Sequence, residues 1–152
     1  MFSHTMEYAL RAMALLAYAQ DAEQLTSTIE LAEKAKVPNN YLAKVLQQLS
    51  SSKLITGRRG VGGGYRLARP AAEIKLLEIV RSVGTLERIT TCPLGLANHG
   101  STLCPLHRTV DLAAKAAMDI LDDATLADLI SGGVKPLCDE AMTLTVSARG
   151  SR

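Results

Sequence analysis

The sequence predicts a mainly α-helical fold, a winged helix-turn-helix with a small two-stranded wing followed by a long C-terminal dimerisation helix. Two observations support this prediction. Apolar residues make up 47% of the 152 residues and aromatic residues 3%, a pool that suits closely packed helices better than an aromatic-rich β-sandwich. The apolar residues recur at helical spacing along most of the chain and change to a spacing of two at a glycine-rich segment. The length allows one compact core with an appended helix and excludes two large independent domains.

Helical periodicity is clear at the start of the chain and again after Ser27. The first helix is expected over residues 3–20, with a buried face made of Met6, Ala9, Leu10, Met13, Leu16 and Ala17. The second is expected from Ser27 to about Lys36. Ser27 and Glu30 have the spacing at which two side chains can cap free N–H groups of the first turn.

The third helix is the candidate recognition helix. Pro38 is expected to open it, because a proline at the first helical position loses no hydrogen bond. Its predicted buried stripe consists of Leu42, Val45, Leu46 and Leu49. The same periodicity turns a polar row away from the core, made of Asn39, Asn40, Ala43, Lys44, Gln47 and Gln48.

The wing is predicted where the period changes. Strand-like segments at residues 54–56 and 65–67 flank the glycine-rich segment 60–64, as in a two-stranded hairpin. Glycines let the backbone take positive φ and approach a ligand closely. Nucleotide-binding loops also use glycines, but they need a Gly-Lys-Ser/Thr that opens a helix, and here a strand containing Tyr65 follows.

Helical periodicity returns after the wing. Pro70 is expected to start a helix that runs to Gly84, with apolar positions at Ile74, Leu77 and Val80. A polar, cysteine-containing loop covers about residues 90–103. A long helix over residues 105–123 and a short one over 125–130 follow it.

The long helix carries a stripe rich in small residues, made of Leu106, Val110, Ala113, Ala114, Ala117 and Leu121. Little of the chain is left to cover this stripe, which predicts pairing with a second copy; burial against the first helix is the alternative. The expected organisation is a winged helix-turn-helix DNA-binding domain (1–83), a cysteine-containing sensor loop (84–104), the dimerisation helix with the short helix (105–131) and a weakly ordered tail (132–152).

Charge is unevenly distributed, although the net charge is only +2. Residues 34–69 contain none of the 15 acidic residues and eight of the 17 basic ones, namely Lys34, Lys36, Lys44, Lys53, Arg58, Arg59, Arg66 and Arg69. A solvated face usually mixes both signs. A positive potential confined to one segment therefore favours docking of a polyanion.

A polar helix followed by a basic hairpin predicts a surface for double-stranded DNA, with the helix in a major groove and the wing along the neighbouring backbone or minor groove. The predicted contact residues are Asn39, Asn40, Tyr41, Lys44, Gln47, Arg58 and Arg59. Asn and Gln side chains can bond bidentately to adenine edges, which assigns base readout to Asn39, Asn40 and Gln47. A homodimer would present two such surfaces to a two-fold symmetric operator.

Other function classes find less support. Glu7 and Arg11 interrupt the N-terminal apolar stretch and no run approaches the ~18–20 residues of a membrane span, so a cytoplasmic protein without a membrane partner is expected. The acidic residues are scattered and no nucleophile with an oriented base is present, so the chain is expected not to be an enzyme. A winged protein-interaction module, which would lack the steep salt dependence of DNA binding, is an alternative.

Three segments of the sequence resemble a known family. They are Glu7-Tyr8-Ala9-Leu10-Arg11, the stretch from Val37 to Gln47, and Arg58-Arg59-Gly60-Val61-Gly62-Gly63-Gly64-Tyr65. Over residues 1 to about 131 the chain is similar to the Rrf-type winged-helix transcription regulators, which include IscR-, NsrR- and RirA-like proteins. The resemblance implies a homodimeric repressor or activator whose long late helix pairs with its mate. In many members an iron-sulfur cluster tunes DNA affinity in response to iron, nitric oxide or redox state.

Cys92, Cys104 and His107 form a candidate metal site. Three cysteines in a chain without a secretion signal argue against a disulfide scaffold and leave metal binding, redox sensing or simple burial. Thiolates bind iron and zinc, and an imidazole can replace a thiolate on a cluster iron. Cys138, alone in the tail, is predicted to be a bystander.

The resemblance implies further ligands. Cluster-bearing relatives have a middle cysteine that would fall near Asn98, where this chain has none, and His99 is the nearest substitute. Some relatives complete the site with an acidic residue from the first helix of the partner subunit. The matching position here is Glu7.

Three interpretations of this loop stay open. The favoured one is a [2Fe-2S] cluster held by Cys92, Cys104, a histidine (His107 or His99) and Glu7. The second is zinc on Cys92, His99, Cys104 and His107. The third is a loop with reduced cysteines that act at most as a thiol switch.

Overall fold

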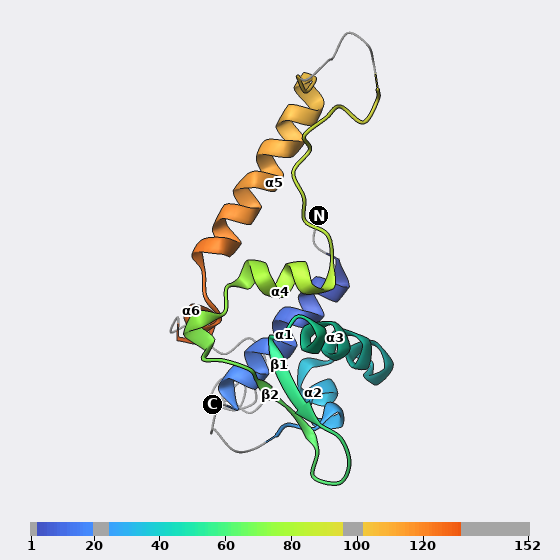
Figure 1. The fold of residues 1–152 in the computed structure, drawn as a ribbon, viewed down its shortest axis with the longest axis vertical. Helices are drawn as coiled ribbons and strands as arrows, with labels where there is room; N and C mark the ends of the chain where they lie inside the picture. Colours follow the sequence, from blue (N-terminus) through green and yellow to red (C-terminus); the bar gives the residue numbers. More distant parts are fainter. Residues whose placement is uncertain (1–2, 20–24, 96–101, 132–152) are drawn as a thin grey trace, which may run out of the picture.

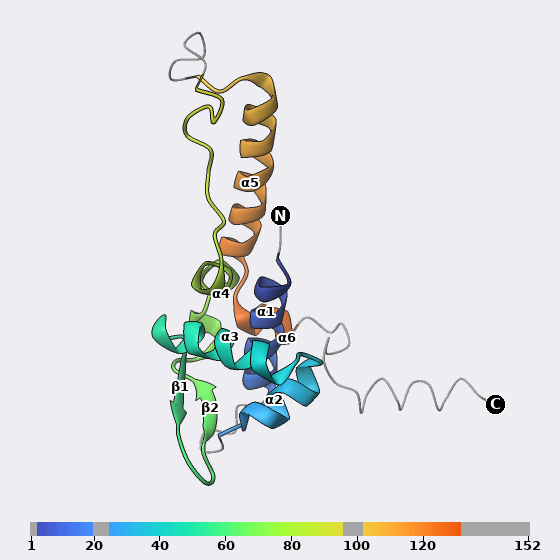
Figure 2. The same cartoon turned by 90° about the vertical axis from the view of Figure 1, so that its right-hand side faces the viewer.

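The computed structural model describes residues 3–19, 25–95 and 102–131. In chain order, its elements are α1 (His4–Tyr18), α2 (Thr28–Ala35), α3 (Asn39–Ser51), β1 (Ile55–Arg58), β2 (Gly64–Leu67), the 3-10 helix η1 (Ala71–Glu73), α4 (Leu76–Val83), α5 (Pro105–Asp123) and α6 (Leu126–Ser131). All elements except α5 form one head, and α5 projects from it beside the segment that follows α4 (Figure 1, Figure 2). The predicted helical fold with a two-stranded wing is confirmed.

α1 is the central helix of the head. The run Ala12–Ala17 is buried without a break, so the helix is covered on nearly every side rather than along one face. It packs against α2, α3, α4, α6 and β2. The small side chains of Ala9 and Ala12, both 0% exposed, let these neighbours approach its axis closely. Leu10, which we expected in the core, is only partly buried at its edge.

The helix-turn-helix consists of α2 and α3. Ser27 caps α2 by accepting a bond from the Glu30 N–H (3.2 Å), but the Glu30 carboxylate binds Lys34 (2.7 Å) and leaves half of the expected reciprocal cap unformed. Pro38 is the N-cap of α3 and not its first residue. The predicted stripe of α3 is buried, with Leu42, Val45, Leu46 and Leu49 all facing the core.

Both helices of this unit end in the same unusual way. After α3, the Lys53 N–H donates to Ser50 O and the Leu54 N–H to Leu49 O, each at 3.0 Å, which is the Schellman pattern. The pattern needs one left-handed residue, a place usually taken by glycine. Here that residue is Lys53, with φ 57°, and the end of α2 repeats the arrangement around Lys36, with φ 56°.

The wing is fixed to the helix-turn-helix by backbone bonds. β1 and β2 pair antiparallel with Ile55 opposite Leu67. β2 also pairs with Thr26, the residue before the N-cap of α2, since Thr26 N–H donates to Tyr65 O (2.9 Å) and Tyr65 N–H donates to Thr26 O (2.8 Å). A Cβ at Gly64 would collide with the Thr26 carbonyl, so this attachment requires glycine there.

The single helix predicted over residues 70–84 is wrong. Ile74 is extended (φ −106°, ψ 113°) and separates η1 from α4. The extended segment pairs with the chain after α5, through Leu76 N–H to Ala124 O (3.0 Å) and Leu126 N–H to Ile74 O (2.8 Å). Apolar spacing could not reveal the break, because the extended Ile74 is itself fully buried.

α5 has the predicted bounds but little cover. All of α5 is described, and Asp111 is its one buried residue. The helix packs on α4 at its base instead of lying along α1 (Figure 1). On the predicted stripe, Leu106 is 65% and Val110 48% exposed. Within the described residues, no helix combines the length and apolar character needed to cross a bilayer.

We expect Lys53→Gly to raise the free energy of unfolding by about 0.5–1 kcal/mol. Removing the Cβ relieves the left-handed backbone, and the larger entropy of the unfolded glycine offsets part of this gain. Lys44→Gly, the same change inside α3, should lower the free energy of unfolding by about 1 kcal/mol. Urea unfolding of both variants measures the two changes in the free energy of unfolding. A loss of stability in Lys53→Gly would contradict the left-handed conformation of Lys53.

Candidate nucleic-acid interface and metal site

The polar row of α3 is on the surface, as predicted. Asn39, Asn40, Lys44 and Gln47 are all exposed. Tyr41, 57% exposed, lies under the Lys44 ammonium, whose nitrogen is 5.9 Å from the ring centroid. These five predicted contact residues therefore share one accessible helix face.

A groove separates this helix face from the wing. It has a volume of about 450 Å³ and is lined by Ala43, Gln47, Ser50, Ser51, Gly57, Arg58, Arg59 and Tyr65. Three of the predicted contact residues, Gln47, Arg58 and Arg59, thus meet around one space. Sequence reasoning missed Ser50, Ser51 and Tyr65, because their role in the lining depends on the distance between α3 and the wing, which periodicity does not report.

The two wing arginines differ in their surroundings. Arg58 Nη2 donates to the Gly62 carbonyl (3.1 Å) and so braces the tip of its own hairpin. Gly63 N–H closes the turn on Gly60 O (2.9 Å), and Gly60 has φ 96°, a conformation that glycine adopts without strain. Arg59 is exposed beside this braced turn.

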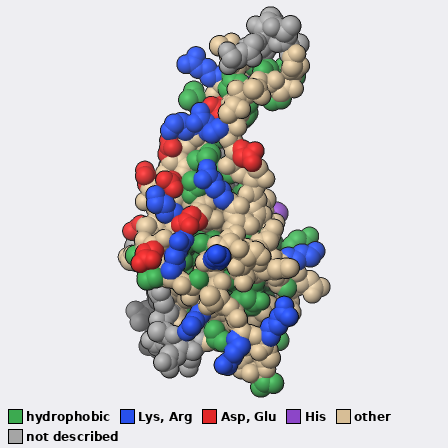
Figure 3. Space-filling view, in the orientation of Figure 1, with side chains coloured by type: hydrophobic (Ala, Val, Ile, Leu, Met, Phe, Trp, Pro, Cys, Tyr) green, Lys and Arg blue, Asp and Glu red, His purple; other side chains and the backbone are tan. Residues whose placement is uncertain are grey.

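The charge pattern of the surface agrees with the sequence. On the face shown in Figure 3, Lys and Arg side chains without Asp or Glu among them lie over the wing end of the head, and the acidic side chains lie toward α5 and its base. On this face, the end of the molecule that carries the wing is therefore the positive one.

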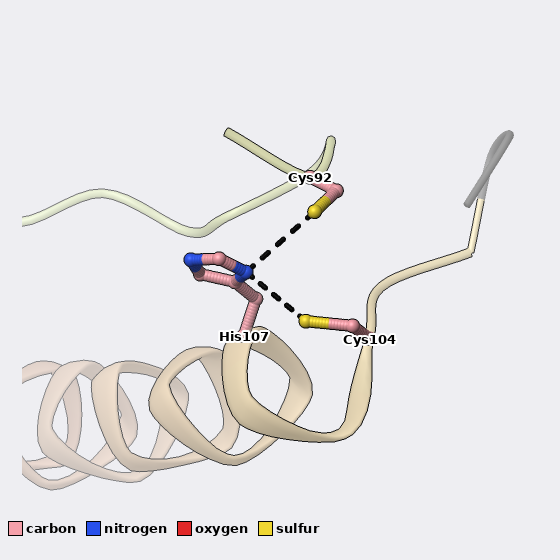
Figure 4. A group of neighbouring side chains, drawn as sticks. All are labelled: Cys92, Cys104 and His107. Carbon is pink, nitrogen blue, oxygen red and sulfur yellow. Dashed lines mark hydrogen bonds between the residues drawn. The ribbon is translucent and has the colours of Figure 1, made fainter. Parts of the chain in front are cut away.

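α5 and the segment that follows α4, residues 84–95, together form an arm that projects from the head (Figure 1). Cys92, Cys104 and His107 meet at its outer end. Cys104 is the N-cap of α5, His107 lies on its first turn, and Cys92 comes from the segment after α4. Their ligand atoms all lie within 4.8 Å of one another. The imidazole Nδ1 faces both sulfurs, at 3.2 Å from Cys104 Sγ and 3.6 Å from Cys92 Sγ (Figure 4).

The donor set fits a thiophilic metal. Two thiolates and an imidazole, each half-buried, suit iron or zinc better than a hard cation. Around one tetrahedral zinc, with Zn–S near ~2.3 Å and Zn–N near ~2.0 Å, sulfur and nitrogen ligands lie about 3.6 Å apart. The 3.6 Å distance from Cys92 Sγ to His107 Nδ1 equals this separation, whereas the 3.2 Å distance from Cys104 Sγ is shorter and is that of a hydrogen bond. In a two-iron cluster each iron takes two protein ligands, so one of these three side chains would have to bind the second iron.

The other proposed ligands are not part of this group. Glu7, on the first turn of α1, pairs with Arg11 and lies at the head, away from the outer end of α5 in both views of the same chain (Figure 1, Figure 2). Asn98, His99 and Cys138 lie outside the described residues. Within the described part of one chain, the structure thus brings together three of the four ligands that a complete site needs.

Comparison with known proteins agrees with this fold. The sequence matches the Rrf2 family, described as iron-dependent transcriptional regulators, over residues 2–132. IscR of T. potens has a similar structure, with a TM-score of 0.71, 23% identity, and coverage of 95% of this chain and 96% of that one.

Two further solved structures are CymR proteins. CymR of B. subtilis, described as the global cysteine regulator, has a TM-score of 0.68 and 25% identity over 86% of this chain and 96% of that one. CymR of S. aureus has a TM-score of 0.65 and 28% identity over 85% and 97%. With a family match that spans nearly the whole described chain and an exposed, basic winged helix-turn-helix, the protein belongs to the Rrf2 family and is a DNA-binding transcription regulator, not an enzyme.

Proposed function

We propose that the protein is a dimeric, sequence-specific regulator, acting as a repressor, that holds α3 in a major groove and the wing in the adjacent minor groove. The observation that carries this proposal is the groove between α3 and the wing. Neighbouring major and minor grooves of DNA are separated by one sugar-phosphate strand. A protein that enters both must leave room for that strand, and this groove, lined by Arg59 and Ser50, offers the room and phosphate donors. Ser51 also lines the groove, but its hydroxyl already donates to the Gln47 carbonyl at 2.9 Å.

The contact residues divide by chemistry. Asn39, Asn40 and Gln47 carry amides that can read base edges, whereas Tyr41 and Lys44 can hold phosphates or bases. Arg59 is the wing residue that would enter the minor groove of the DNA or bind its phosphates. Arg58, predicted as a second contact, already braces the wing tip and acts on DNA chiefly by shaping the hairpin.

Dimerisation through α5 follows from its lack of cover. Apolar side chains on one side of the helix are exposed, including Leu106, Val110 and Ile120. An apolar face of this length on a projecting helix favours association with a second copy, and a two-fold axis would present two DNA-binding heads to a symmetric operator.

The sensor is proposed to be a [2Fe-2S] cluster on Cys92, Cys104 and His107, with Glu7 of a second copy as the fourth ligand. The iron-dependent family match and the converging thiolates and imidazole support this assignment. When bound, the cluster supplies a change of charge and ligation in response to iron, nitric oxide or redox state. The chain's own part is to hold three donors on the arm and to keep Glu7 within reach of a partner.

A single zinc ion is the second candidate for this site. The convergence of Nδ1 and the two sulfurs within 4.8 Å favours it, and the 3.6 Å distance from Nδ1 to Cys92 Sγ matches the spacing of two ligands around one ion. Zinc would hold the segment after α4 against the start of α5, and the protein would then sense its signal at a different site.

DNA binding should separate phosphate contacts from base contacts. Arg59→Ala should weaken binding to a selected operator and to random DNA alike, and should lower the slope of log K against log salt by about 0.9. Asn40→Ala should relax the preference at particular bases by about 1–3 kcal/mol. Fluorescence anisotropy titrations at several salt concentrations measure both. Lys115→Ala, which removes a cation from α5, is the charge-matched control. Equal losses on both DNAs for Asn40→Ala and Arg59→Ala would refute the division.

Cofactor content should follow the two cysteines. Protein purified without oxygen is expected to show visible absorption with stoichiometric iron and sulfide, both lost in Cys92→Ala and Cys104→Ala, whereas Cys138→Ala keeps them. Stoichiometric zinc without sulfide would favour the second candidate. A colourless protein without metal would leave a regulator with a thiol switch at most.

The oligomeric state should depend on the apolar face of α5. Val110→Glu should give monomers in sedimentation velocity and lose affinity for a symmetric operator, because it places a charge on the proposed interface. Arg108→Glu, two residues earlier and also exposed, is the control for a charge off the stripe. Unchanged dimers in Val110→Glu would place the interface elsewhere.

A further inference from the structure

An ion pair one helical turn beyond the candidate metal site joins the segment after α4 to α5. Arg88 binds both carboxylate oxygens of Asp111, with Nε to Oδ1 and Nη2 to Oδ2 each 2.6 Å. The Ile89 N–H also donates to Asp111 Oδ1, at 2.9 Å. A single carboxylate therefore accepts three bonds from two consecutive residues of the opposite segment.

Asp111 is an exception on its helix. It is 6% exposed, whereas the rest of α5 is exposed or half-buried. A carboxylate taken out of water is costly unless its oxygens are hydrogen-bonded, and here both are. The bonds from the Arg88 guanidinium hold the pKa of Asp111 below its ordinary value, so the group is ionised throughout the neutral range.

The ion pair lies close in sequence to the residues of the candidate metal site. Ile89 precedes Cys92 by three residues, and Asp111 follows His107 by one turn of α5. Before Arg88, the last residue of this segment in the core is Leu86, which is 7% exposed.

The effect on the two thiols follows from tether length. With the ion pair intact, the chain is held at Ile89, three residues before Cys92. Without the pair, the nearest fixed residue before Cys92 is Leu86, six residues away. The effective concentration of tethered groups falls roughly as the −3/2 power of tether length, so doubling the tether lowers it about threefold.

We infer that Arg88 and Asp111 are positioning residues that bring Cys92 to Cys104 and His107. They act through the backbone of the segment and do not ligate metal themselves. Their role toward a cofactor rests on the function proposed above, whereas the approach of the two thiols does not depend on any cofactor.

The metal-free thiol equilibrium tests the inference directly. In a Cys138→Ser background, the protein is equilibrated without metal in glutathione buffers. One glutathione disulfide takes the two hydrogens of Cys92 and Cys104, leaving a protein disulfide and two reduced glutathiones. We expect Asp111→Asn to lower the equilibrium constant for this disulfide by about threefold or more. Mass spectrometry of protein whose free thiols have been alkylated measures the ratio of disulfide to reduced protein.

Matched variants separate positioning from general loss of structure. Asp122→Asn removes a carboxylate of the same helix that pairs with Lys75, and it should leave the thiol equilibrium unchanged. Exchange of the partners in Arg88→Asp with Asp111→Arg should recover much of the wild-type constant. Helical content by circular dichroism and binding to random DNA should stay at wild-type values throughout. A wild-type constant in Asp111→Asn, or an equal fall in Asp122→Asn, would overturn the inference.

Cobalt binding separates this inference from the proposed function. Co²⁺ is titrated into reduced protein, and the thiolate-to-cobalt absorption reports binding. Asp111→Asn should weaken it about threefold or more, the loss expected from the longer tether of Cys92. If the wild type binds no Co²⁺ while the thiol equilibrium still shifts in Asp111→Asn, the metal site fails and the positioning role stands.

Discussion

Burial of α1 is the constraint on which the head depends. Both helices of the helix-turn-helix, α4, α6 and the second strand of the wing all pack against this one helix. Its small residues set how closely they approach, since a larger side chain at a fully buried alanine such as Ala12 has no free volume to enter. The angle between α3 and the wing, and hence the width of the groove between them, is fixed by elements that share this support.

The sequence predicted those features that repeat locally. The stripe of α3 and the bounds of α5 follow from helical spacing, and the hairpin follows from the change of period at the glycines. Features that depend on distant partners were missed. Ile74 is extended because it pairs with the chain after α5, and nothing near Ile74 in the sequence announces this pairing.

The candidate site was predicted in the same uneven way. Cys104 and His107 are recognisable together because they are three apart at a helix start, and Cys92 because few cysteines exist to choose from. Arg88 and Asp111 carry no motif, because an ion pair between residues 23 apart depends on how the arm folds back. The stripe of α5 was predicted as an interface from its composition. In the structure of one chain Leu106, Val110 and Ala113 of this stripe are exposed, whereas Leu121 is partly buried against the core.

The braced wing tip has a consequence for how targets would be told apart. Because Arg58 donates to the Gly62 carbonyl, we assign the DNA groove chiefly to Arg59, and Val61 is the one side chain among the glycines of segment 60–64. A minor groove shows nearly the same acceptors for A·T and T·A, but its width and potential vary with the stiffness of the sequence, and narrow grooves attract arginine. Two operators with identical bases under α3 would then differ in affinity through the mechanics of their flanking DNA.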